Sequence, residues 1–209
     1  DLPHGPAAKT AFADFLEVQQ FHILVAHVAL DVAIQLIHRR APTFAGLQVP
    51  TFEEVVACAL RLNLGLQVEL KPTIGDDVET AEVVIPILKR MWPVRLEGLF
   101  VSSFSVRSLV RARQLWPEVP LAMASLVAPA DPAALLAEYG CRILHVLDDM
   151  LDDHHLERLR HSGVEFAVAT INNPYRARYL LARGAQSILS DYPDLLDKPA
   201  GLHHADALG

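Results

Sequence analysis

The chain has 209 residues, of which 52% are apolar and 21% are charged, and its formal net charge is −7. This length allows one sizeable hydrophobic core but is short for two ordinary domains, and the composition excludes a disordered chain. We therefore expect a single domain over residues 1–209. The acidic balance argues against a general nucleic-acid surface, which needs clustered Lys and Arg. A small anionic substrate remains compatible with it.

The apolar runs of the chain are too short or too interrupted for a membrane span, which needs about 18 residues. The longest run, residues 21–37, contains His22, His27, Asp31 and Gln35. The first residues lack the basic start and apolar run of a signal peptide. We expect a cytoplasmic protein without stable membrane insertion. Cys58 and Cys141 both lie in apolar stretches and are expected to be free thiols.

The first 45 residues give the weakest pattern. Residues 14–19 and 22–27 are predicted as two short strands, and residues 31–39 as a helix. From residue 50 onward, short β-branched runs alternate regularly with helical runs. The predicted strands are 65–70, 99–103, 121–125, 142–146, 165–170 and 186–190. The predicted helices are 52–62, 78–91, 106–116, 132–139, 153–162 and 175–183.

Capping residues support the predicted helix ends. Thr51, Asp131 and Asn173 stand where a side-chain oxygen can accept from the first free amides, and Pro132 and Pro174 suit the first helical turn. Gly140, Gly163 and Gly184 follow helices, where a left-handed residue often ends the helix.

Strands that alternate with helices at this spacing are parallel and joined by crossover helices. Two arrangements of such a sheet are possible, a closed barrel and an open doubly wound sheet. The sequence has no Gly-rich turn after its first clear strand and no phosphate-binding Gly-x-x-x-x-Gly-Lys loop. This favours a (β/α)8 TIM-type barrel whose N-terminal strand region is shortened or incomplete.

In such a barrel, catalytic side chains come from the carboxyl ends of the strands. The polar residues at or near these positions are Glu69, Lys71, Ser102, Ser103, His145, Thr170, Asn172, Ser190 and Asp191. Each also has an ordinary structural interpretation. Glu69 and Lys71 lie on one strand face and could form a surface ion pair. The serines, asparagine and aspartate suit caps and turns, and His145 could be a satisfied structural residue.

The acidic stretch Asp148–His155 also has two interpretations. It fits a solvated loop and helix start, whereas a metal site there would need ligands that converge on one point. The pattern alone therefore predicts a barrel with polar strand ends and names no reaction.

Ordered sequence blocks resemble the glycerophosphodiester phosphodiesterase family. Residues 49–55 (VPTFEEV) and 65–72 (GLQVELKP) resemble its "iPTLeEvl … lnvElKp" stretch. The other blocks are FVSSF at 100–104, VATINNP at 168–174 and GAQSILSDYP at 184–193, which resemble "SSF", "vwTvNdp" and "GvdgiiTDyP". Together they cover residues 45 to 196 in family order.

The N-terminal third resembles the family less closely. Residues 13–18 (ADFLEV) resemble "adflEvDvq", and Leu24 to Asp31 resemble "vviHDetLdr". Gln19 replaces the family's second acid, Glu17 and His27 are only ten residues apart, and the opening "HRG … ENT" motif is matched only by His4-Gly5. Either the protein is a degenerate member, or the printed sequence omits loop residues near the site.

The resemblance implies hydrolysis of a small-molecule glycerophosphodiester to an alcohol and glycerol 3-phosphate. It implies a divalent cation, Mg²⁺ or Ca²⁺, held by Glu17 and Glu69. It implies catalytic roles for Lys71, His27 and His4. Substrate contacts are implied for Ser103 and Asn172.

Two other functions stay open at this point. A degenerate barrel would bind phosphodiesters or serve as a scaffold. Another barrel enzyme acting on phosphorylated small molecules would need a phosphate site after the last two strands, where the Gly-rich amides typical of such sites are absent. Homo-oligomerisation is also open, because Trp92 and Trp116 end helices and could be exposed or pack between neighbouring helices.

Overall fold

The computed structural model describes residues 50–192 of the chain. The strands predicted at 14–19 and 22–27, and the helix predicted at 31–39, lie outside these residues. The same is true of the candidate site residues His4, Glu17 and His27.

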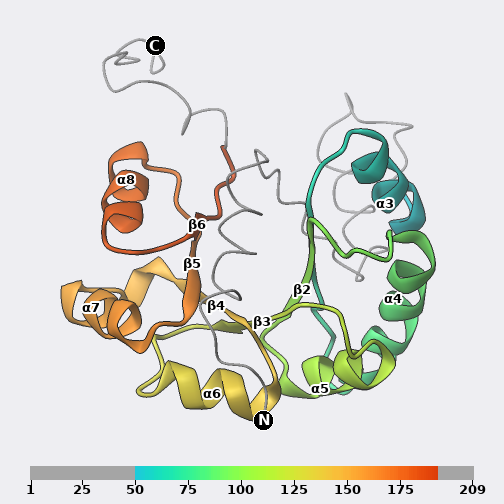
Figure 1. Cartoon of the computed structure of the whole chain (residues 1–209), viewed down its shortest axis with the longest axis horizontal. Helices are drawn as coiled ribbons and strands as arrows, with labels where there is room; N and C mark the ends of the chain where they lie inside the picture. The colour runs from blue at the N-terminus through green and yellow to red at the C-terminus, as the bar shows by residue number, and fades with distance from the viewer. Residues whose placement is uncertain (1–49, 193–209) are drawn as a thin grey trace.

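The described residues form six parallel strands that pair in sequence order. They are β1 Leu66–Glu69, β2 Leu99–Ser103, β3 Leu121–Ser125, β4 Ile143–Leu147, β5 Glu165–Ala169 and β6 Ser187–Ile188. The sheet is curved, and the helices lie along its outer side (Figure 1). Six parallel strands that alternate with helices in a curved sheet show the repeating architecture of a (β/α)8 barrel, which confirms the predicted fold class.

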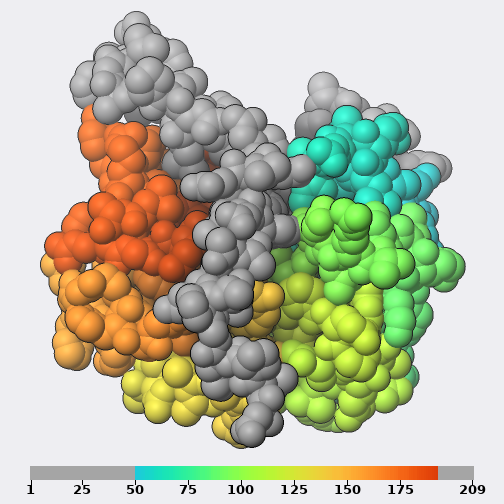
Figure 2. All heavy atoms as spheres, viewed as in Figure 1, coloured from blue at the N-terminus to red at the C-terminus, as the bar shows by residue number. Residues whose placement is uncertain are grey.

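The helices follow one another around the outside of the sheet, so that successive units occupy adjacent sectors of the molecule (Figure 2). They are α3 Phe52–Arg61, α4 Asp77–Met91, α5 Val106–Leu115, α6 Pro132–Tyr139, α7 Asp153–Ser162 and α8 Pro174–Ala182. A short 3₁₀ helix, η2 Asp148–Met150, precedes α7.

The N-caps predicted from the sequence mark the starts of α3, α6 and α8. Thr51 and Glu54 form a reciprocal capping box at the start of α3. Asp131 accepts from the Ala134 amide at 2.9 Å, and Asn173 accepts from the amide of Tyr175 at 2.8 Å. Gly140 ends α6 in the left-handed conformation with φ 64°, which a side chain would make costly.

The predicted boundaries differ from the observed ones mainly at two strands. β4 begins and ends one residue later than expected. β6 is only two residues long, shorter than the predicted 186–190. Its chain leaves the sheet early because Ser190 and Asp191 bond to the Asn172 side chain, which turns the chain into a loop.

The main core lies between the outer face of the sheet and the helices. On β1 and just after it, Leu66, Val68 and Leu70 are each 1% exposed and belong to this core. Trp92 and Trp116 are buried in the same core, and the Trp92 indole N–H donates to the Glu97 carbonyl at 3.1 Å. The two tryptophans therefore pack between elements of their own fold.

The inner face of the sheet faces the lumen and carries a different set of residues. Phe100, Ala122 and Ile143 form a small apolar cluster separate from the main core. They share the inner face because Ala122 is in register with Ser102 on one side and with Ile143 on the other. On β2 to β4 these three side chains form an apolar floor, above which the strands continue toward their carboxyl ends.

Within residues 50–192, no helix combines the length and apolar character that crossing a membrane requires.

Cys58 is half-buried and Cys141 is buried, and both are free thiols, as predicted.

Candidate active site

The carboxyl end of β1 carries Glu69 and Lys71. Glu69 is the last residue of the strand and is half-buried, whereas Lys71 is exposed. Glu69 lies on the inner face because it is two residues from Gln67 and in register with Ser102. In the part of the chain that the structure describes, no ion pair joins Glu69 to Lys71 or to any other residue. The surface ion pair considered from the sequence is therefore not formed.

Ser103 lies at the end of β2, fully buried and bonded within the protein. Its hydroxyl donates to the Leu70 carbonyl at 2.6 Å and accepts from the Ser105 amide at 3.0 Å. These bonds fix the segment that leads from Glu69 to Lys71 against β2. The substrate contact expected for Ser103 stays a prediction, while its observed partners give it a structural role.

Asn172 follows β5 and binds the loop after β6. Its side-chain oxygen accepts from the Ser190 hydroxyl at 3.1 Å and from the Asp191 amide at 2.9 Å. Its amide donates to the Asp191 carboxylate at 2.9 Å. Asn172 lies four strands from Glu69 in the sheet, and no hydrogen bond of the described residues joins the two. Its predicted contact with substrate also stays a prediction.

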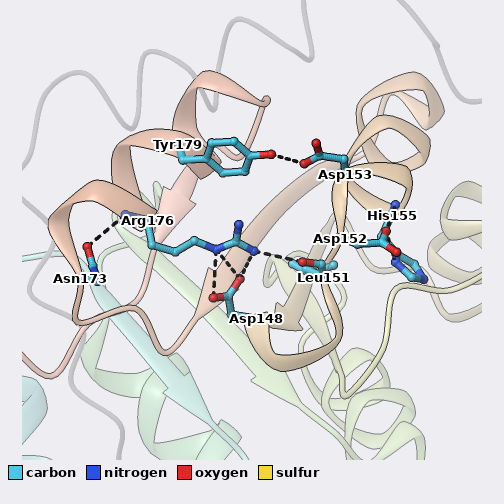
Figure 3. A network of polar contacts seen from close by, with 8 residues as sticks. All are labelled: Asp148, Leu151, Asp152, Asp153, His155, Asn173, Arg176 and Tyr179. Atoms are coloured by element: carbon cyan, nitrogen blue, oxygen red, sulfur yellow. Dashed lines mark hydrogen bonds and ion pairs between the residues drawn. The ribbon is translucent and has the colours of Figure 1, made fainter.

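A second polar connection joins η2, just after β4, to α8, which follows β5 (Figure 3). The Arg176 guanidinium on α8 binds the Asp148 carboxylate through two nitrogens, at 2.6 and 3.0 Å, and donates to the Leu151 carbonyl at 3.1 Å. Such a two-pronged contact is geometrically specific. The hydrogen bond to Asp148 raises the pKa of Arg176, so the guanidinium stays charged.

The acidic stretch around this connection therefore divides into two parts. Asp148 is a half-buried structural partner, whereas Asp152 caps α7 by accepting from the His155 amide at 2.8 Å. The pKa of the Asp152 carboxyl is lowered, chiefly by that backbone hydrogen bond. The solvated helix start predicted from the sequence is correct for Asp152, but the sequence did not indicate the Arg176 partner of Asp148.

Deeper in the lumen, three buried polar side chains form a network. The Gln67 amide nitrogen donates to the Ser102 hydroxyl at 2.9 Å and lies 3.2 Å from Nδ1 of His145. The three residues are 3%, 1% and 6% exposed, respectively. Burial lowers the pKa of His145 to about 4, so the imidazole is neutral near pH 7 and Nδ1 can accept from Gln67. His145 is thus a structural residue, as one interpretation of the sequence proposed.

Gln67 is the residue of this network that sequence reasoning missed. Only strand ends were considered as polar positions, yet Gln67 lies on the same face as Glu69 two residues earlier. A polar residue inside an otherwise apolar strand was the available signal.

The described residues contain no cluster of three His, Cys, Asp or Glu side chains that could hold a metal ion. Glu69 is the only predicted metal ligand among them, because Glu17 lies outside the described range. At the carboxyl end of β1, the described residues therefore provide one carboxylate on the lumen face, Glu69, and one exposed lysine, Lys71. The ends of β2 and β5 are fixed by internal hydrogen bonds.

Solved structures with this fold include two phosphodiesterases. One is a phosphodiesterase of Oleispira antarctica, in complex with the product sn-glycerol-3-phosphate. It superposes with a TM-score of 0.66 at 30% identity, over 70% of this chain and 59% of that one. A glycerophosphodiester phosphodiesterase of Parabacteroides distasonis has a TM-score of 0.66 at 17% identity, over 91% of this chain and 86% of its own, a likeness of fold alone.

Curated relatives are found in Bacillus subtilis. The chain is 27% identical to YhdW over 167 residues, and 28% identical to the glycerophosphodiester phosphodiesterase of that organism over 164 residues. Each alignment covers 75% of this chain but only 64% and 56% of the respective relative, so the chain spans about three fifths of their length. The model of the glycerophosphoryl diester phosphodiesterase family matches residues 10–195, and the chain belongs to that family.

Proposed function

We propose that the protein hydrolyses small glycerophosphodiesters to an alcohol and glycerol 3-phosphate with the help of a divalent cation. The observation that carries the proposal is the end of β1, where Glu69 faces the lumen without an ionic partner in the described residues and Lys71 follows it. Family membership supports the reaction class. The product bound to the Oleispira antarctica relative supports glycerol 3-phosphate as the product here.

The donor chemistry at Glu69 fits a hard cation. A carboxylate oxygen is the ligand type that Mg²⁺ and Ca²⁺ prefer, and the Glu69 carboxylate makes no hydrogen bond or ion pair within the described residues that would compete for it. We propose that Glu17 supplies a second carboxylate from outside the described residues. When bound, the cation would polarise a phosphoryl oxygen of the substrate.

The remaining roles belong to the side chains of the chain. We assign to the Lys71 ammonium the neutralisation of negative charge that develops on the phosphoryl oxygens. We assign proton transfer to His27, because an imidazole titrates near neutral pH, with His4 as its partner. Ser103 and Asn172 remain the proposed substrate contacts, and their internal bonds keep the strand ends in place.

The proposal names glycerophosphodiesters as the substrate class but does not name the head-group alcohol. Charged glycerophosphodiesters fit a mouth that presents a lysine and a cation-binding carboxylate. The alcohol that leaves would be selected by loop residues around the mouth. The cytoplasmic location and self-association predicted from the sequence stay predictions.

Chelation tests the proposal. Turnover of glycerophosphocholine, glycerophosphoethanolamine and glycerophosphoglycerol should stop in excess EDTA and return when Mg²⁺ or Ca²⁺ is added beyond the chelator. Full turnover in EDTA would rule out the cation mechanism. Binding of these compounds without turnover, at any concentration of either cation, would favour the degenerate binding protein over the enzyme.

A further inference from the structure

The middle of the lumen is polar where barrels of this type are filled with branched apolar side chains. Phe100 and Ile143 belong to the apolar floor, and each is followed two residues later on the same face by a polar residue, Ser102 and His145. Gln67 joins these two residues, and Glu69 follows Gln67 by two. The inner face thus has an apolar floor, a buried polar layer and the candidate carboxylate above it.

The polar layer spans four strands. Gln67 on β1 reaches His145 on β4, 78 positions later in the chain. The reach is possible because the inner-face residues of the intervening β3 are small, Ala122 and Ala124, and β2 contributes only the Ser102 hydroxyl. The layer therefore combines one contact between neighbouring strands, Gln67–Ser102, with one contact that crosses the lumen, Gln67–His145.

This connection matters most for β1, which pairs only with β2 among the described strands. Ladder bonds and the Ser103 bond hold β1 from the β2 side alone. The amide of Gln67 adds a connection to β4 that acts directly below Glu69. A small shift of a ligand carboxylate weakens metal binding and catalysis, because such sites need their geometry held within a fraction of an ångström.

The polar layer is not the most stable filling for this space. Both amide hydrogens of Gln67 have acceptors, but its buried side-chain oxygen has no hydrogen-bond partner among residues 50–192. A buried acceptor without a donor costs free energy, and an apolar side chain of similar shape would avoid that cost. A feature that is unfavourable for folding and lies beneath a candidate ligand is better explained by its effect on the ligand.

We propose that Gln67, through Ser102 and His145, is a positioning residue that fixes the carboxyl end of β1 and thereby sets the geometry of Glu69 and Lys71. The inference rests on the proposed cation-dependent function. It assigns no contact between Gln67 and substrate.

The test compares Gln67→Met with Val68→Ala. Methionine keeps the length of the side chain and removes both amide donors, whereas Val68→Ala removes a buried side chain from the opposite face of the same strand. Calorimetric titration with Mg²⁺ or Ca²⁺ gives the dissociation constant of the cation, and urea unfolding gives stability. Gln67→Met should raise the dissociation constant by about 10-fold or more, as loss of outer-shell support to metal ligands does.

The two variants should separate binding from stability. Val68→Ala should lower the urea midpoint and leave the cation affinity unchanged. Ser102→Ala removes only the hydroxyl that accepts from the Gln67 amide, and this small change should let the protein fold. It should weaken cation binding by a smaller factor than Gln67→Met. Turnover should fall more in Gln67→Met than in Ser102→Ala. The fall should be in kcat at saturating cation, with a smaller change in KM.

Two failures are distinguishable. If the wild-type chain binds cation and hydrolyses substrate, but Gln67→Met and Ser102→Ala change only the urea midpoint, the positioning role is wrong and the proposed function stands. If the wild-type chain neither binds cation nor hydrolyses any glycerophosphodiester, the proposed function fails and the positioning role fails with it.

Discussion

The two faces of β1 differ in what they contribute to the molecule. Leu66 and Val68 point outward into the main core, whereas Gln67 and Glu69 point into the lumen. The outward side chains are apolar and almost completely buried, so they stabilise the fold through burial. The inward ones are a buried amide with an unsatisfied oxygen and a carboxylate without a partner in the described residues. Adjacent residues of one strand therefore differ in kind: the outward ones stabilise the core, and the inward ones carry the function that we propose.

The largest expected effect is the loss of turnover when the Glu69 carboxylate on the inner face of β1 is replaced. Glu69→Gln keeps the size of the side chain but removes the anionic oxygen that the proposed cation requires. Turnover of glycerophosphocholine should fall by more than about a thousandfold, while the free energy of unfolding stays within about 0.5 kcal/mol of wild type.

Glu118→Gln is the matched control for that change. Glu118 is an exposed glutamate in the turn after α5, far from the lumen face of β1. This variant should keep full activity. A Glu69→Gln protein that retains wild-type turnover would show that the carboxylate has no essential role.

The second effect is a loss of stability without a loss of turnover, expected for a change on the outer face of β1. Leu66→Ala removes a side chain that is 1% exposed, and we expect the free energy of unfolding to drop by about 2–5 kcal/mol. Turnover per folded molecule should stay near that of wild type. Chemical denaturation and an activity assay corrected for the folded fraction measure both quantities. A large loss of turnover in the folded fraction would mean that the two faces are coupled.

The third effect is a pH dependence of stability that comes from His145, which is buried in the lumen. Burial lowers the pKa of His145 from 6.5 to about 4, so the unfolded chain binds a proton in a pH range where the folded protein does not. Stability from this residue is complete above pH 6.5 and is lost as the pH falls toward 4, at about 1.4 kcal/mol per pH unit within the window.

Urea unfolding between pH 7 and 4 tests this slope. The difference between wild type and His145→Asn isolates it from the exposed histidines and the carboxylates. A difference in unfolding free energy that does not change with pH would show that His145 titrates normally in the folded protein.

The sequence predicted the repeating units well because their signals are local. The start of α6 is marked by Asp131 and Pro132, and its end by Gly140, so both helix boundaries were correct. The strands were recognised from short apolar runs. A cap or an apolar run depends on a few adjacent residues, and its interpretation does not require knowledge of the sheet register.

The contacts that shape the mouth and lumen could not be predicted in the same way. The Gln67–His145 contact joins residues 78 positions apart, and the Arg176–Asp148 pair joins residues 28 apart. Both depend on how distant elements of the sheet are brought together, and the Gln67–His145 contact also depends on the small side chains of β3 between the partners. No local pattern specifies either. The sequence therefore predicted Glu69 and Lys71 as strand-end residues, but not the polar layer beneath Glu69.

The most direct test of the central claim is the conversion of glycerophosphocholine by the wild-type chain, followed by ³¹P NMR in the presence of Mg²⁺ or Ca²⁺. The phosphodiester signal should be replaced by the monoester signal of glycerol 3-phosphate, with choline released in equal amount. Glu69→Gln under the same conditions should leave the diester intact. Persistence of the diester with the wild-type chain, across both cations and the panel of head groups, would contradict the proposed activity.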